Sequence, residues 1–334
     1  MTENTTFARV TAANNPAPAA LLDMWQQAMV ELAPKTRQRY RGALQHFFSW
    51  FAQEEGRPLA LADLHPITLV GYRGSLQDVA ATSTVNTHLC ALRAWCRWLH
   101  DHGYLTVNPA VRLKLVGRQT PSAPRALKAA HVNALLRQAQ HTRYPARNTA
   151  IVQMLVQTGM RIGECAALRW EDIRYGEKRG QVCIRAGKGN KARTIPLNDS
   201  VRQALADYVA PLLQVDATLK AVATVWPRSP LGGSSTPLWT SERRRQLSVR
   251  EMSRVIHALV RDCAARGLVP ADATPHSLRH TFATRYLATH QDDLVGLARL
   301  LGHSSLDATM IYVQPTEDEL AARVDRIDLN AYAR

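Results

Sequence analysis

The sequence predicts a mainly α-helical protein of two domains, the second of which carries a small antiparallel sheet. Three observations support this prediction. The chain has 334 residues, more than a single small core usually serves. Apolar residues recur at three- and four-residue spacing over residues 21–103, the period of amphipathic helices. Two short strand-like segments, residues 181–186 and 191–196, flank a Gly-Lys-Gly-Asn turn, a pattern typical of a hairpin.

The composition favours a globular protein with a polyanionic partner. Lys and Arg total 42 against 27 Asp and Glu, a net charge of +15, and each phosphate that a basic surface neutralises releases condensed counterions. A well-solvated basic surface is the alternative. No apolar run approaches the roughly 18 to 20 residues of a membrane span, and residues 1–11 lack the pattern of a signal peptide. We therefore expect a cytoplasmic protein.

The cysteines give no sign of a disulfide or zinc framework. They are odd in number, scattered, and contain no Cys-x-x-Cys pair. We expect all five to be reduced core residues. They are Cys90, Cys96, Cys165, Cys183 and Cys263.

The first domain is predicted over residues 18–110, after a polar segment, residues 1–17, that we expect to be a flexible tail. Two apolar stripes indicate its helices: Tyr40, Leu44, Phe47, Phe48 and Phe51, then Val85, Leu89, Leu92, Cys96 and Leu99. Opposite the second stripe lie four polar residues, Asn86, Arg93, Arg97 and His100. This polar face is either a solvated surface or a surface that contacts DNA.

A basic linker is predicted over residues 111–125. Residues 112–147 contain eight Lys or Arg and no acidic residue, and residues 116–124 add Gly, Ser and two prolines, the composition of an extended segment. A basic linker between two basic domains suits a protein that closes around a duplex. Arg118 and Arg125 are therefore candidate DNA contacts.

The second domain is predicted over residues 126–315. A helix over residues 148–158 should end at Gly159, with another beginning near Arg161, and helices resume at Val201 after the hairpin. The Pro-, Gly- and Ser-rich residues 227–241 are expected to form a surface loop. A final amphipathic helix is predicted in the tail, residues 316–334, with its apolar stripe at Leu320, Val324 and Ile327.

Four short segments of the second domain place basic residues where the chain turns. They are Thr158–Glu164, Lys188–Lys191, Thr274–His280 and Leu301–Ser305. Their candidate functional residues are Arg161, Lys188, His276, Arg279 and His303, and Tyr312 follows His303 by nine residues. Thr274 and Pro275 have the residue types of an N-cap and a first helical residue. His276 and Arg279, three residues apart, would then share one helix face.

Each segment alone has another interpretation. Arg161 could be a surface residue paired with Glu164 rather than an anion ligand at a helix start. His276 and His280 have the spacing of zinc ligands, although the Glu of H-E-x-x-H and an evident third ligand are missing. The turn at Lys188 lacks the spacing of a phosphate-binding P-loop.

The order Arg…Lys…His-x-x-Arg…His…Tyr resembles the tyrosine recombinase (phage integrase) family, and in size and motifs the chain is similar to Xer-type recombinases. The resemblance spans about residues 20–325. It includes Thr36-x-x-x-Tyr40, Phe47-x-x-Trp50, Thr84-Val85-Asn86, Trp98 and Asn108-Pro109 in the first domain. It implies a helical, SAM-like core-binding domain followed by a catalytic domain with the DNA breaking-rejoining fold. The chain departs from compact members at residues 227–241.

The resemblance implies a strand-transfer site whose chemistry suits these residues. Arg161 and Arg279 would hold the two non-bridging phosphate oxygens, and His303 would add a hydrogen bond. Tyr312 would be the nucleophile, with His276 relaying its proton. Lys188, or Lys191 in reserve, would protonate the leaving 5′ oxygen. The 3′-phosphotyrosyl bond conserves the bond energy, so no ATP or other cofactor is expected. No metal is expected either, because the arginines would take its place, and Glu164 would orient Arg161.

The expected partners are double-stranded DNA with inverted-repeat half-sites and other copies of the chain, as a dimer on one site and a tetramer in synapsis. An accessory DNA-binding protein is an open alternative, no membrane is expected, and the enzyme would associate with the nucleoid. Two other functions fit the same features. One is a type IB topoisomerase that relaxes supercoils as a monomer, and the other is a non-catalytic DNA-binding protein. The second should lack a catalytic residue, and none is lost.

Overall fold

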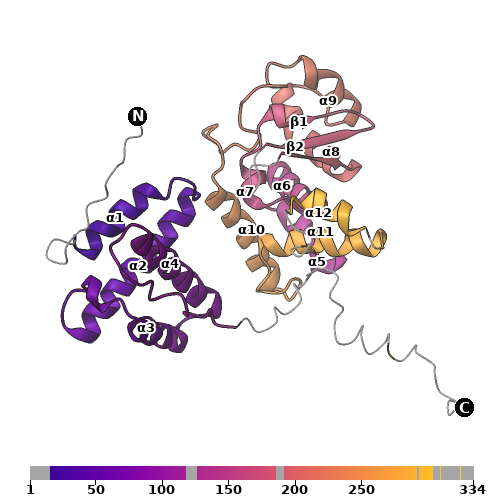
Figure 1. Cartoon of the computed structure of the whole chain (residues 1–334). Coiled ribbons are helices and arrows are strands. Elements are labelled where there is room, and N and C mark those ends of the chain that lie inside the picture. Colours follow the sequence, from indigo (N-terminus) through magenta and orange to yellow (C-terminus); the bar gives the residue numbers. More distant parts are fainter. Residues whose placement is uncertain are drawn as a thin grey trace, which may run out of the picture. The chain divides into compact units, whose positions relative to one another are not determined.

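The computed structural model describes residues 16–117, 126–185, 192–291, 293–303, 309 and 324. The chain divides into two compact units, with the boundary between Pro121 and Ser122 (Figure 1). Both are mainly helical, and the second carries a small antiparallel sheet, so the predicted fold class is confirmed. In the part of the chain that is described, no helix is long and apolar enough to cross a membrane.

Over residues 16–117 the first unit is a bundle of four helices with an aromatic core. They are α1 (Pro18–Ala28), α2 (Pro34–Glu55), α3 (Pro66–Val79) and α4 (Thr82–Asp101), with a short 3-10 turn at Leu61–Asp63. A proline opens each of the first three, where its missing N–H costs no helical hydrogen bond. Trp25, Phe47, Tyr72 and Trp95 are fully buried between the helices. The stripe from Val85 to Leu99 is buried as predicted.

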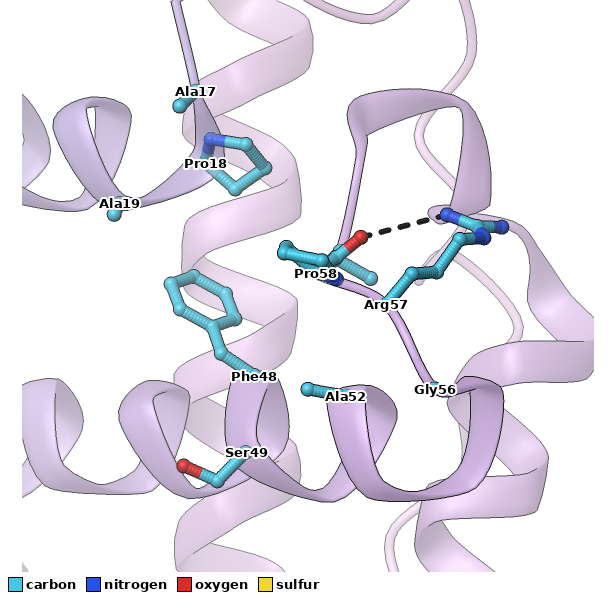
Figure 2. A pocket seen from close by; sticks show the side chains of 10 residues that line it. Ala17, Pro18, Ala19, Phe48, Ser49, Ala52, Gly56, Arg57 and Pro58 are labelled. Carbon is cyan, nitrogen blue, oxygen red and sulfur yellow. Dashed lines mark hydrogen bonds between the residues drawn. The ribbon is translucent and has the colours of Figure 1, made fainter.

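An open apolar pocket of about 460 Å³ lies in this unit, between the start of α1 and the end of α2 (Figure 2). Phe48, Pro18 and Pro58 line it together with Arg57. The Arg57 guanidinium donates two hydrogen bonds of 2.7 Å to the carboxylate of Asp63. The pocket lining contains none of the predicted catalytic residues.

The second unit is built around α6. Its helices are α5 (Ala129–Gln140), α6 (Pro145–Thr158), α7 (Ile162–Ala166), α8 (Asp199–Leu213), α9 (Leu219–Val225), α10 (Val249–Ala264), α11 (Pro275–Thr289) and α12 (Leu294–Leu301). Helix α6 packs against α5, α8 and α11, and its buried side chains form much of the core. Gly159, just past the C-terminal end of α6, lies against Phe282 of α11, so this end of α6 is beside the helix that carries part of the candidate site.

The sheet has three antiparallel strands in the order β1-β2-β3. They are β1 (Ile173–Arg174), β2 (Gly180–Ile184) and β3 (Arg193–Leu197). Val182 lies opposite both Ile173 and Ile195. The predicted hairpin is confirmed in its two strands, while β1 escaped prediction because two residues carry no periodic pattern.

Two expectations about exposure were wrong. The second half of residues 227–241 is not a surface loop, because Leu238 and Trp239 are fully buried and the Trp239 indole donates a 2.9 Å hydrogen bond to the Cys165 carbonyl. The surrounding Gly, Ser and Pro residues concealed this apolar pair. Cys183 is exposed rather than part of the core, since the side chains of a strand alternate between its two faces.

Candidate active site

Arg279 is carried by α11, which begins as the sequence predicted. Thr274 caps the helix, accepting a hydrogen bond from the Ser277 N–H, and Pro275 is the first helical residue. The cap fixes the start of the helix, so His276 and Arg279 follow one helical turn apart. Arg279 points into the unit and is only 2% exposed.

The Arg279 guanidinium is held by backbone carbonyls at the ends of two helices. It donates to the Gly159 carbonyl at 2.6 Å and to the Leu301 carbonyl at 2.7 Å. Gly159 ends α6 in the left-handed conformation, with φ +62°, which L side chains rarely adopt. A Cβ there would also lie 2.4 Å from the Phe282 ring. The glycine that stops α6 thus places its carbonyl where Arg279 can use it.

His303 lies directly beside Arg279. Its Nε2 is 3.0 Å from the Arg279 Nη2, and its Nδ1 is 2.8 Å from the Thr309 hydroxyl. A guanidinium only donates, so Nε2 accepts and the ring proton is on Nδ1. Burial, together with the positive charges of Arg279, Arg161 and Arg193, lowers the pKa of His303 to about 4. The imidazole is neutral at physiological pH.

Arg161 precedes α7 and contacts the carboxylate of Glu164. Its backbone N–H and its Nη1 donate to Glu164 at 2.7 and 3.0 Å. The pairing with Glu164 suggested by the sequence is present, and 35% of the Arg161 side chain remains exposed to solvent. Glu164 also accepts two hydrogen bonds from Arg193, at 2.7 and 3.0 Å.

Sequence reasoning missed Arg193, although a signal was present. In β3, Ile195 and Leu197 are buried while Thr194 and Pro196 are exposed. Because side chains alternate along a strand, Arg193 belongs to the buried face of the strand. An arginine on the apolar face of a predicted strand requires a buried partner, and Glu164 supplies it.

His276 and His280 stack one turn apart on α11, with ring centroids 4.2 Å apart in an edge-to-face arrangement. Burial lowers the pKa of His276, and Arg279 and Arg161 lower it further. Burial together with His276 and Arg279 lowers the pKa of His280 to about 4. Among the described residues, no third His, Cys, Asp or Glu joins this pair to form a metal-binding cluster.

The structure therefore brings four predicted site residues into one electrostatic environment: Arg161, His276, Arg279 and His303. Lys188, with its reserve Lys191, and Tyr312 lie outside the described residues. Neutral imidazoles beside fixed guanidinium groups can bind an anion and accept a proton at neutral pH.

The four residues predicted to contact DNA in the first unit differ from one another in exposure and in hydrogen-bond partners. Asn86 exchanges two hydrogen bonds with the Val116 backbone, at 3.0 and 2.8 Å, so its amide joins α4 to the segment after it. Arg97 and His100 are exposed and Arg93 is half-buried, and the His100 ring lies 3.2 Å from the Asp101 carboxylate. Arg118 and Arg125 lie outside the described residues.

Comparison with known proteins identifies the family of the chain. Residues 125–319 match the Phage integrase family, and residues 25–103 match its N-terminal SAM-like domain. Tyrosine recombinase XerC of Rhodospirillum centenum is 30% identical over 91% of this chain and 85% of its own length.

Two solved structures share the fold. The Tn1549 transposon integrase in complex with transposon right end DNA has a TM-score of 0.68 at 19% identity, covering 92% of this chain and 98% of that one. A lambda integrase dimer bound to a COC′ core site has a TM-score of 0.65 at 19% identity, covering 90% and 78%. The chain belongs to the phage integrase family of tyrosine recombinases, enzymes that break and rejoin DNA strands.

Proposed function

We propose that the chain recombines DNA at paired inverted-repeat sites, with Arg161, Arg279 and His303 binding the scissile phosphate and Tyr312 attacking it. The observation that carries this proposal is the Arg279 guanidinium, fixed by the Gly159 and Leu301 carbonyls and adjacent to His303. A guanidinium fixed before substrate arrives costs little reorganisation when charge develops on the phosphate oxygens.

The two arginines divide the binding of the phosphate. Arg279 is buried and fixed, while Arg161 is tethered to Glu164 and partly exposed. Together they present donors to both non-bridging oxygens, as forked guanidinium groups do for phosphates. His303 reaches the phosphate once its Nε2 is protonated or turned from Arg279, and the developing charge favours that protonated form.

Proton transfer is assigned to His276 and Lys188. A phenol has a pKa of about 10, so Tyr312 needs a base, and burial and the two arginines keep His276 neutral and able to accept a proton. The phenolate forms a bond to phosphorus as the bond to the 5′ oxygen breaks. Lys188, which lies in the sequence between β2 and β3, protonates that leaving oxygen, with Lys191 in reserve. The reverse attack by a 5′-hydroxyl rejoins DNA.

We further propose a dimer on each site and a tetramer in synapsis, working on the nucleoid in the cytoplasm. The lambda integrase structure is a dimer on its core site, which supports oligomeric binding. Val324 lies in the predicted apolar stripe of residues 316–334 and is 62% exposed. Contact between this tail and a neighbouring copy of the chain would bury the apolar stripe. Whether an accessory protein is required is decided by recombination with purified enzyme alone.

The test uses a nicked suicide duplex built from inverted repeats of roughly 11 base pairs found beside the coding region. Wild type should form a covalent protein–DNA adduct, and Tyr312→Phe should form none while binding the same duplex. Tyr286→Phe is the matched control, because its hydroxyl is hydrogen-bonded to Asp293 at 2.6 Å. Excess EDTA should change the rate by less than about twofold, under ~0.5 kcal/mol.

An adduct formed by Tyr312→Phe would overturn the nucleophile assignment. A collapse of the rate in EDTA that zinc restores would favour the metal interpretation of His276 and His280. Relaxation of supercoiled plasmid lacking the repeats, by a monomer, would favour a type IB topoisomerase over a site-specific recombinase.

A further inference from the structure

We propose that Arg193 is a positioning residue for DNA cleavage, acting on Arg161 through Glu164 and on His303 through the end of α12. The inference rests on the roles proposed above for Arg161 and His303. It concerns a residue of the sheet that contributes no proposed contact to the phosphate.

The Arg193 guanidinium joins three segments of the second unit. Its Nη1 and Nη2 form a fork on the two carboxylate oxygens of Glu164, and its Nε donates to the Leu300 carbonyl at 2.8 Å. The side chains of Arg193 and Glu164 are each only 7% exposed. A forked, desolvated pair of this kind fixes both partners in distance and angle.

Through Glu164, this contact reaches Arg161. Burial alone would raise the pKa of Glu164, but hydrogen bonds from Arg193 and Arg161 hold it below its ordinary value. If Arg193 were absent, Arg161 would be the remaining charged partner described for this buried carboxylate. A buried carboxylate without sufficient partners draws in the nearest cation. Arg193 thus allows Arg161 to keep part of its guanidinium for the phosphate.

Through Leu300, the same contact reaches His303. Arg193 binds the Leu300 carbonyl and Arg279 binds the next carbonyl, that of Leu301. Gly302 then ends α12 at φ +67°, and a Cβ there would lie 2.8 Å from the Arg193 Nη1. The backbone that leads into His303 therefore passes close to this guanidinium. Arg193 therefore fixes the backbone from which His303 projects.

The principal test is Arg193→Met in the full chain, on the same suicide duplex. Misplacement of catalytic groups by about 1 Å can cost on the order of 100-fold in rate, so single-turnover cleavage should fall about 10- to 100-fold. Binding of the duplex, measured by gel shift, should stay within about threefold, because no proposed phosphate contact is removed. Arg193→Lys keeps the charge but not the fork, and should recover only part of the rate.

The pH profile separates positioning from general damage. In Arg193→Met the burial of Glu164 remains while two of its hydrogen bonds are lost, so its pKa rises. The acid limb of the cleavage profile should therefore move to higher pH, whereas loss of folded protein would lower the rate at every pH equally. Glu164→Gln combined with Arg193→Met removes the buried charge with its partner. The double variant should be less impaired than the product of the two single defects.

Arg202→Met is the matched control, since Arg202 is another buried arginine of this unit. It donates to the Gly176 and Glu177 carbonyls and pairs with Asp199. Its loss should lower thermal stability without moving the acid limb. If wild type forms no adduct, the proposed function fails. If wild type cleaves and Arg193→Met matches it in rate and profile, or if the double variant is strictly multiplicative, only the inference about Arg193 is overturned.

Discussion

The cores of the two units differ in the residue types that form them. Within residues 16–117 no charged side chain is fully buried, and the core is formed by aromatic and aliphatic residues such as Trp25, Phe47 and Trp95. In the described part of the second unit, Arg147, Arg202 and Arg279 are buried, along with polar residues. Each of these arginines donates to at least one backbone carbonyl.

We attribute this difference in buried charge to the proposed role of Arg279 in the second unit. Burying a guanidinium costs several kcal/mol unless hydrogen bonds offset it, so a core that serves stability alone is better made of apolar groups. The first unit follows that rule. The second accepts buried charge at Arg279, where the guanidinium lies beside His303 at the proposed phosphate site.

The largest expected effect comes from breaking the apolar core of the first unit. Trp95 is fully buried and packs on Phe48, with ring centroids 5.3 Å apart. Trp95→Ala should destabilise this unit by about 3–5 kcal/mol, measured by denaturant-dependent hydrogen exchange. DNA affinity should fall with it. Cleavage at saturating DNA should stay within a few-fold, and a parallel loss there would mean that this core also sets the catalytic geometry.

A smaller effect is expected at the glycine that ends α6. Gly159→Ala places an alanine in the left-handed backbone conformation, which lowers the unfolding free energy by about 1–2 kcal/mol. The added Cβ also overlaps with Phe282, which lowers it by a further amount of about 1–3 kcal/mol. We expect a loss of about 2–5 kcal/mol in the second unit and slower cleavage, since the Gly159 carbonyl holds Arg279. Gly56→Ala in the first unit is the matched control.

Gly56 has φ +66° but nothing within 4 Å of its added Cβ, so its substitution should cost only about 1–2 kcal/mol. Urea denaturation of both variants measures the difference. Equal losses at the two glycines would show that backbone strain alone matters and that packing at the site does not.

The smallest of these effects is that of pH. The pKa values of His280 and His303 are lowered to about 4 in the folded protein, below the roughly 6.5 of an unfolded histidine. Folding stability from such groups is present above pH 6.5 and is lost as the pH falls toward 4. The second unit should lose on the order of 1–2 kcal/mol between pH 7 and pH 5.

Hydrogen exchange at pH 7 and pH 5 measures this loss in each unit separately. His88 in the first unit also has a lowered pKa, through burial and His46, so this unit should weaken too, but less. A larger loss of stability in the first unit would contradict the expectation that His280 and His303 of the second unit dominate the pH dependence.

The sequence predicted local features well where a residue type carries its own physical rule. Thr274 and Pro275 begin α11 and Gly159 ends α6, as their conformational preferences require. The apolar stripe of α4 follows from its period.

Features that depend on distant partners escaped prediction. Arg193 meets Glu164 across 29 residues and Leu300 across 107, and Trp239 meets Cys165 across 74. Neither spacing nor composition encodes such a contact. The Pro-, Gly- and Ser-rich surroundings of Trp239 pointed toward solvent instead. The alternation along β3 indicated that Arg193 is buried, but only once the strand was placed against the core.

We propose that Arg279 is buried for chemistry rather than for stability, and the variant Arg279→Met distinguishes the two. Methionine removes the cost of burying charge but leaves two carbonyls without their donor, at about 1–3 kcal/mol each. We expect these changes nearly to cancel, with unfolding free energy within about 1–2 kcal/mol of wild type, while single-turnover cleavage falls by at least about 10²-fold. A loss of about 4 kcal/mol or more, with cleavage by the folded fraction unchanged, would contradict the claim.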